Sequence, residues 1–317
     1  MGLSARIRAF TWPLTGIAAL LLAAACSSTP GAAPASTEPA QQAALEEQLP
    51  IKGPRTENGY QAILGTPDLG VGTNRIGVLL TSPRGFVKAS MVEFTSWYVA
   101  DGPAQGPAAT ARAEFHQWPY TVSRGLYVAE LDFDRPGLWR IEAEVPSDGG
   151  GVEIVRVEFE VRPEPLAPAV GDKAPASVTM TAADVGRLSQ LTTGSLQDPD
   201  LYRISLADAV ASGLPTVVVF ASPAFCITEV CGPQVEVLQE LKNKYKGRAN
   251  FVHVDFYSNP EEIQGDLGNA VVSPAVVEWR LPSIEWTFVI DANGVITGRF
   301  EAFATVEELD AALSKVF

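Results

Sequence analysis

Positively charged residues are scarce in this sequence of 317 residues. Lys and Arg together number 23 against 37 Asp and Glu, so the formal net charge is −14. Proteins that hold nucleic acid or anionic lipid by charge need a basic surface, because phosphate groups are attracted to Lys and Arg. The acidic balance therefore argues against a nucleic-acid partner and against electrostatic adhesion to a membrane.

Long apolar runs are missing beyond the N-terminus. A membrane-spanning helix needs roughly 20 consecutive apolar residues, and no segment after Cys26 provides them. The apolar run from Thr15 to Ala25 is itself too short to span a bilayer stably. Arg6 and Arg8 precede it and small residues end it, which is the order of an export signal that is removed by cleavage.

The end of this run, Ala23-Ala24-Ala25-Cys26, resembles the lipobox of bacterial lipoproteins. The resemblance implies that residues 1–25 are a signal peptide and that Cys26 becomes the lipid-modified N-terminus, carrying diacylglycerol on its sulfur. The alternative is an ordinary secreted protein with a cysteine at that place. We expect a protein anchored by lipid to the cell membrane and facing its extracytoplasmic side.

The composition of the remaining chain predicts a tether, two folded domains and a linker. Residues 26–58 are rich in Ala, Ser, Pro, Thr and Gln and predict a disordered tether. Residues 59–162 predict an all-β, immunoglobulin-like sandwich, because short alternating segments are separated by turn residues at hairpin spacing. The six predicted strands span residues 75–81, 88–98, 111–118, 126–133, 138–145 and 152–161. Within them, Gly125–Ala129 and Pro136–Trp139 resemble the last strands of small extracytoplasmic YtkA-like sandwich domains, a resemblance that implies no chemistry.

Residues 163–169 form a proline-rich linker, and residues 170–317 predict an α/β domain. Its expected elements are a helix over 205–212, a strand over 216–220, a helix over 233–246 and a strand over 250–256. A partly helical region, 260–280, precedes strands over 286–290 and 295–300 and a last helix over 305–316. Ser205 with Asp208, and Thr305 with Glu308, are expected to cap the first and last of these helices.

Cysteine is the next scarce residue, with three in the chain. If Cys26 carries lipid, Cys226 and Cys231 remain, and an oxidising compartment allows such a pair to form a disulfide. In a regular helix these positions would lie about 8–9 Å apart at Cα, whereas a disulfide tolerates up to about 7 Å. The pair can therefore be bridged only if the helix begins after Cys226. Pro233 favours this arrangement because proline suits the first helical turn.

The stretch from Pro215 to Tyr245 resembles the active-site segment of the thioredoxin superfamily. A β-branched strand leads into a cysteine loop and then a helix, and Cys231-Gly232-Pro233 matches the start of the family's Cys-Gly-Pro-Cys motif. The order of elements in residues 170–317 is also that of the thioredoxin fold. The resemblance implies thiol–disulfide exchange with exported proteins through Cys226 and Cys231. Either cysteine could attack, and we favour Cys226 because the resolving cysteine normally follows the nucleophile in this family.

The sequence departs from the thioredoxin pattern at three positions. Gln234 replaces the second cysteine of the motif, and Val219 stands in the strand where a buried acid is usual. Glu285 takes the place of the proline that normally faces the cysteines. A carboxylate there would disfavour a thiolate, or else Glu285 or Glu229 would accept a proton during exchange. These departures keep a rival hypothesis open, a non-catalytic binding lipoprotein with a structural disulfide.

Histidine and methionine are too few to suggest a metal centre. Copper proteins of the thioredoxin fold combine two cysteines with a histidine, but the two histidines here, His116 and His253, each stand alone in predicted strands. A lone histidine in a strand is more often structural than a metal ligand. The sequence also has no phosphate loop, dinucleotide fingerprint or Ser/His/Asp set. We therefore predict no cofactor and no metal ligand.

Overall fold

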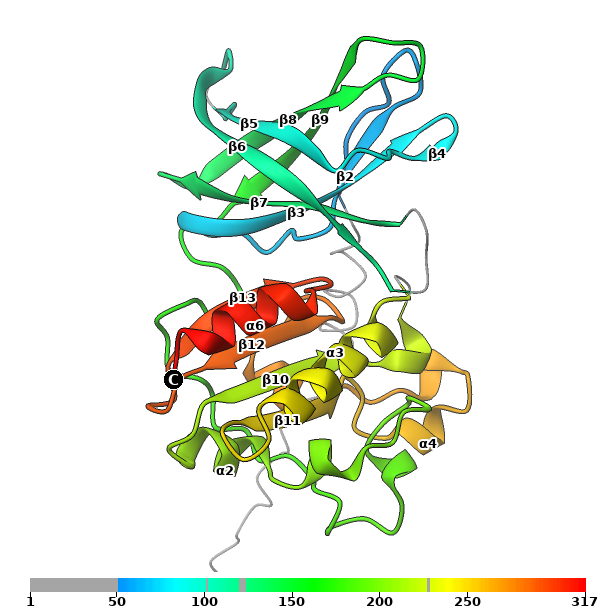
Figure 1. The fold of residues 1–317 in the computed structure, drawn as a ribbon, viewed down its shortest axis with the longest axis vertical. Coiled ribbons are helices and arrows are strands. Elements are labelled where there is room, and N and C mark those ends of the chain that lie inside the picture. The colour runs from blue at the N-terminus through cyan, green and yellow to red at the C-terminus, as the bar shows by residue number, and fades with distance from the viewer. Residues whose placement is uncertain (1–50, 101, 120–123, 227–228) are drawn as a thin grey trace, which may run out of the picture. The chain divides into compact units, whose positions relative to one another are not determined.

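The computed structural model describes residues 51–100, 102–119, 124–226 and 229–317 (Figure 1). The predicted signal peptide, Cys26 and most of the predicted tether lie outside these ranges. The end of the tether segment is described, and Ile51–Lys52 forms strand β1, which pairs with β2 (Gln61–Leu64). This end of the segment is therefore part of a sheet. None of the helices in the described ranges is long and apolar enough to cross a membrane.

Within the described ranges, nine antiparallel strands form the first sheet. Hydrogen bonds connect them in the order β1-β2-β3-β7-β6-β5-β8-β9, and β4 pairs with β3. All six predicted strands are present, as β3 and β5 to β9, although β6 begins earlier than expected. Beyond β1 and β2, the strands are β3 (Gly72–Ser82), β4 (Gly85–Phe86), β5 (Met91–Tyr98), β6 (Gln105–Gln117), β7 (Gly125–Phe133), β8 (Gly137–Pro146) and β9 (Val152–Val161).

The first sheet curls until its two edges nearly meet. Gly53, next to β1, lies against the backbone of Arg156 in β9, so that a Cβ atom at Gly53 would overlap the Arg156 carbonyl. Twist accumulates across a large antiparallel sheet, and curling lets one face enclose a core. Alternate residues such as Val157 and Phe159 point into that core. One hydrogen-bonded sheet stands where a sandwich has two, and the immunoglobulin-like assignment stays a prediction.

The second sheet is mixed and has four strands, in the order β11-β10-β12-β13. Strands β10 and β11 are parallel, and the other neighbours are antiparallel. The order β-α-β-α-β-β-α agrees with the sequence prediction. The elements are α2 (Leu206–Ala211), β10 (Thr216–Ala221), α3 (Cys231–Lys244), β11 (Asn250–Asp255), α4 (Pro260–Ile263), α5 (Pro274–Glu278), β12 (Trp286–Ile290), β13 (Ile296–Glu301) and α6 (Val306–Ser314), with short 3-10 turns η1 (Leu188–Gln190), η2 (Pro199–Tyr202), η3 (Pro223–Phe225) and η4 (Leu267–Asn269).

Helices cover both faces of the second sheet, so its central strand is wholly apolar. Every residue of β10 is buried. Val217 and Val219 pack with α3 and α6, which lie over one face in Figure 1. Val218 and Phe220 pack on the other face, with α2 and α5. Burial on both faces explains the continuous β-branched run in the sequence, and it holds the end of β10 rigidly beside the start of α3.

Both predicted helix caps form. Ser205 accepts a hydrogen bond from the backbone of Asp208 at the start of α2. At α6, Thr305 and Glu308 make a reciprocal capping box. Each bond satisfies an N–H group that the first helical turn leaves without a partner.

The predicted linker packs against the loop between β2 and β3, which contains Asp68. The buried carboxylate of Asp68 accepts hydrogen bonds from the backbone of Leu166 at 2.8 Å and of Ala167 at 2.9 Å. The same carboxylate pairs with Arg299 of β13. The described residues form one compact unit, and the division into two domains at 163–169 stays a prediction.

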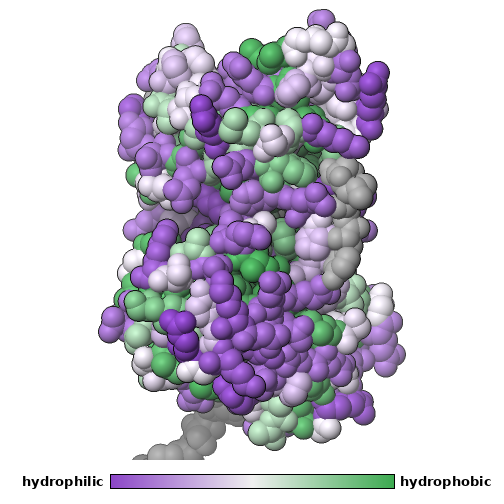
Figure 2. Space-filling model, viewed as in Figure 1, coloured by the Kyte–Doolittle hydropathy of each residue, from purple (hydrophilic) through white to green (hydrophobic). Residues whose placement is uncertain are grey.

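Large aromatic side chains are buried in the cores of both sheets. The exposed fractions of Trp139, Trp279 and Trp286 are 1%, 0% and 0%. On the face drawn in Figure 2, hydrophilic residues cover most of the surface and apolar residues appear in small separate groups. These tryptophans therefore support the cores and do not offer a binding surface.

Candidate functional site: a cystine at the start of helix α3

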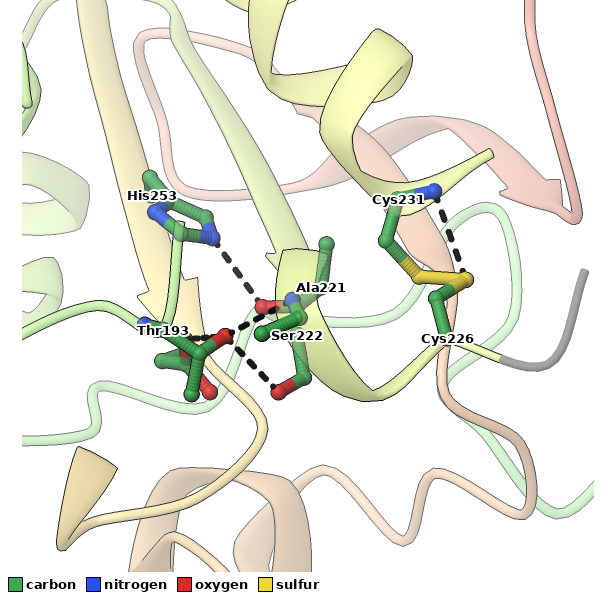
Figure 3. The surroundings of a disulfide bond; sticks show 8 residues. Thr193, Ala221, Ser222, Cys226, Cys231 and His253 are labelled. Carbon is green, nitrogen blue, oxygen red and sulfur yellow. Dashed lines mark hydrogen bonds between the residues drawn. A yellow bond between two sulfur atoms is a disulfide. The ribbon is translucent and has the colours of Figure 1, made fainter. Parts of the chain in front are cut away.

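Cys226 and Cys231 are joined by a disulfide at the junction of β10 and α3 (Figure 3). Their Cα atoms lie 5.9 Å apart, within the range that a disulfide tolerates. Cys226 has an extended backbone after η3, and Cys231 is the first residue of α3. The helix thus begins two residues before the predicted range of 233–246, and Pro233 lies in its first turn as expected. Residues 227–228, between the two cysteines, are outside the described ranges.

The two sulfur-bearing residues differ in exposure. Cys231 is fully buried, and Cys226 is partly exposed. The backbone N–H of Cys231 donates a hydrogen bond to Sγ of Cys226 at 3.3 Å, the dashed line in Figure 3. A free N–H at a helix N-terminus carries partial positive charge, so this bond favours negative charge on Cys226 when the bridge opens.

Gln234 has a structural role in the place of the motif's second cysteine. Its side chain is fully buried, and its Oε1 accepts a hydrogen bond from the backbone of Ala304 at 2.9 Å. This contact ties α3 to the segment before α6. At the position of the motif's second sulfur, this chain therefore has a buried amide that bonds α3 to the segment before α6.

Glu285 lies next to the bridge, just before β12. One carboxylate oxygen of Glu285 is within 4.8 Å of both sulfur atoms. The residue is 6% exposed, and among the described residues neither carboxylate oxygen has a hydrogen-bond partner. Burial raises the pKa of Glu285 to about 8, although the charge of Arg75 opposes the shift. The acid is therefore predominantly uncharged at neutral pH.

Glu229, the other acid proposed from the sequence as a proton acceptor, is not buried. Its side chain is exposed and forms an ion pair with Arg124 at 2.7 Å. Of the two acids, the structure brings Glu285 to the sulfurs and leaves Glu229 at the surface.

The sequence reasoning missed a buried acid beside the strand that leads to the cysteines. Val219 itself faces the α3 core, but Asp255 ends the neighbouring parallel strand, in register with Ala221. Asp255 accepts hydrogen bonds from the backbone and hydroxyl of Thr193 at 2.7 and 2.9 Å. The Thr193 hydroxyl in turn contacts Ser222 at 3.1 Å (Figure 3). Burial raises the pKa of Asp255 to about 6. The sequence feature that could have identified Asp255 is an acid at the carboxyl end of a strand whose other residues are mostly apolar.

Both histidines are engaged elsewhere. His253 is buried in β11, where one ring nitrogen lies 2.6 Å from the Tyr202 hydroxyl and the other lies 3.1 Å from the Ala221 carbonyl oxygen. Burial lowers the pKa of His253 to about 4. His116 lies 2.7 Å from the carboxylate of Glu308. Neither imidazole joins the cysteine pair.

Comparisons with known proteins add a distant structural likeness. No family model matches the chain. No curated protein matches it either. A thiol:disulfide interchange protein of the thioredoxin family from Chlorobium tepidum TLS, known from its crystal structure, aligns at 16% identity with a TM-score of 0.32. The alignment covers 47% of this chain and 99% of that one. The strand order and the cystine position described above define the class, an α/β protein with a disulfide at a helix N-terminus.

Proposed function

We propose that the protein exchanges thiols and disulfides with exported proteins through Cys226 and Cys231, in a thioredoxin-like domain. The observation that carries the proposal is the asymmetry of the bridge. Cys226 is the partly exposed member of the pair, while Cys231 is buried. A hydrogen-bond donor at the helix start faces Cys226, as a reactive cysteine requires.

In the oxidising direction, a partner thiolate attacks Sγ of Cys226 and displaces the sulfur of Cys231 as a thiolate. A second partner thiolate then attacks the partner sulfur of the mixed disulfide and releases Cys226. Two electrons pass from the partner dithiol to the bridge, and the partner leaves with a disulfide. In the reducing direction, Cys226 attacks a partner disulfide and Cys231 resolves the mixed species. Both directions pass through a mixed disulfide at Cys226.

Glu285 belongs to the same site because its carboxyl group reaches both sulfurs. When the sulfur of Cys231 leaves as a thiolate, Glu285 would donate its proton to that sulfur, and the negative charge would pass to the carboxylate. The lipobox supports anchoring through Cys26, which would place the exchange reaction at the extracytoplasmic face of the membrane. The immunoglobulin-like domain then serves as a spacer between membrane and redox site.

Trapping tests the assignment of Cys226. In Cys231→Ser, the partly exposed Cys226 should form a mixed disulfide with oxidised glutathione rapidly. In Cys226→Ser, the buried Cys231 should react much more slowly. Equal rates in the two variants, measured by intact mass over time, would contradict the proposed roles.

A binding protein with a structural bridge is the second candidate. Gln234 favours it, since this residue serves packing where the related motif has chemistry. A redox titration of the wild-type chain separates the two functions. A working couple has a potential of about −270 to −120 mV, and a structural disulfide lies below about −300 mV.

A further inference from the structure

We propose that the reduced protein binds a zinc ion through Cys226, Cys231 and Glu285. The three residues bring two sulfurs and a carboxylate oxygen within 4.8 Å of one another. Two thiolates and a carboxylate are ligands that zinc accepts in proteins. The site requires a reducible bridge and so rests on that part of the proposed function.

The geometry of the cluster suits a tetrahedral ion. Zn–S bonds of about 2.3 Å and Zn–O bonds of about 2.0–2.2 Å place ligand atoms about 3.4–3.8 Å apart. Once the disulfide is reduced, the two sulfurs are no longer bonded and must separate to a similar distance. Cys226 follows a 3-10 turn and lies in no helix or strand, so its backbone is not held by the hydrogen bonds of a regular element. A displacement of this size is within the reach of one side-chain torsion.

The carboxylate of Glu285 is the second reason for a metal site. Among the described residues, both oxygens of this carboxyl group have no hydrogen-bond partner although the side chain is buried. A buried polar group without a partner costs free energy, and native proteins usually give it one. The oxygen that lies near both sulfurs would gain a strong bond from a shared cation. Coordination would thus satisfy a group that the protein itself leaves unsatisfied.

The oxidation state controls this site. A partner dithiol reduces the Cys226–Cys231 disulfide with two electrons and two protons and becomes a disulfide itself. Zinc then replaces the protons on both thiols and on the carboxyl group, and these protons pass to solvent. Three protein ligands leave the fourth tetrahedral position for water or a partner thiolate. A partner disulfide that takes two electrons from the two thiolates is reduced to a dithiol and re-forms the bridge, which removes two ligands and releases the ion.

The experiment uses the full chain with Cys26→Ser, so that Cys226 and Cys231 are the remaining thiols. The protein is reduced with a phosphine, its thiols are counted by alkylation, and Zn²⁺ is titrated against a chromophoric chelator. We expect one zinc per reduced chain and none per oxidised chain. Loss of an outer-shell partner alone costs about 10–100-fold in metal affinity, so Glu285→Gln should weaken binding at least about 100-fold. Glu229→Gln, on the exposed loop, is the matched control and should leave the affinity unchanged.

A gain-of-ligand variant keeps the test independent of the stability of Glu285→Gln. With Co²⁺ as the probe, Glu285→Cys should raise the sulfur-to-cobalt absorption per ion by about half, because three thiolates replace two. The zinc site is refuted if two free thiols are counted but zinc does not bind, or if Glu285→Gln binds as tightly as wild type. The exchange function survives that result. A bridge that resists reduction overturns both proposals.

Discussion

The buried acid beside the bridge makes the stability of the oxidised protein depend on pH. Glu285 has an ordinary pKa of 4.5 in the unfolded chain, and burial raises its pKa to about 8 in the folded chain. Between these values the folded chain holds a proton that the unfolded chain has lost. The free energy of unfolding therefore falls as the pH rises through this range. Glu285→Gln removes the titrating group with little change in shape.

The size of the effect follows from the two pKa values. Each unit of pKa difference corresponds to about 1.4 kcal/mol, so the full shift of Glu285 is equivalent to about 5 kcal/mol. About 1 kcal/mol of this cost is already present near pH 5, and nearly all of it is present near pH 9. Relative to Glu285→Gln, the wild type should therefore lose about 4 kcal/mol between these conditions. Most of this loss in the free energy of unfolding occurs between pH 4.5 and about pH 8, the two pKa values of Glu285.

Urea unfolding at a series of pH values measures this difference. Both proteins keep the disulfide, and a chelator keeps metal away from Glu285. Glu240→Gln, on the exposed face of α3, is the matched control because its charge meets water in both states. If the free energies of unfolding of wild type and Glu285→Gln differed by the same amount at every pH, the burial of an uncharged Glu285 would be refuted. If wild type instead lost stability relative to Glu285→Gln as the pH fell, the pKa of Glu285 would be lowered by folding and not raised.

Three further changes test other parts of the molecule. Cys26→Ala should abolish partition of the processed protein into the detergent phase, and a variant that stays membrane-bound like wild type would remove the lipoprotein hypothesis. Gln234→Ala should lower the free energy of unfolding by about 1–3 kcal/mol because the buried N–H of Ala304 loses its acceptor, and thermal unfolding with Glu240→Ala as control measures it. Asp68→Asn should cost about 3–5 kcal/mol because Arg299 keeps a buried charge without its partner; a loss below about 1 kcal/mol in urea unfolding would mean that the pair is solvated.

Elements with a strong local signal could be predicted from the sequence. Strand β9 and strand β12 have the predicted limits, because alternation or β-branched runs between turn residues specify them locally. The capping box at Thr305 was predictable for the same reason, since both partners lie within one turn. Strand β6 begins at Gln105, earlier than predicted. Gly106 and Pro107 interrupt the alternating pattern of the sequence there, although the strand pairs with β5. Pairing across a sheet can include residues whose own preferences do not favour a strand.

The sequence by itself determined the cysteine pair, the start of the helix near Pro233 and the position of Glu285 just before β12. These conclusions depend on spacing along the chain and on backbone preferences that act within a few residues. Only the tertiary structure decided that Glu285 is buried beside the sulfurs, because that contact joins residues about 55 positions apart, through the packing of β12 against β10. It also decided which cysteine is partly exposed and placed Asp255 beside the strand that leads to the pair. Burial is a property of the packed molecule, and burial is what perturbs these acids and separates the roles of the two cysteines.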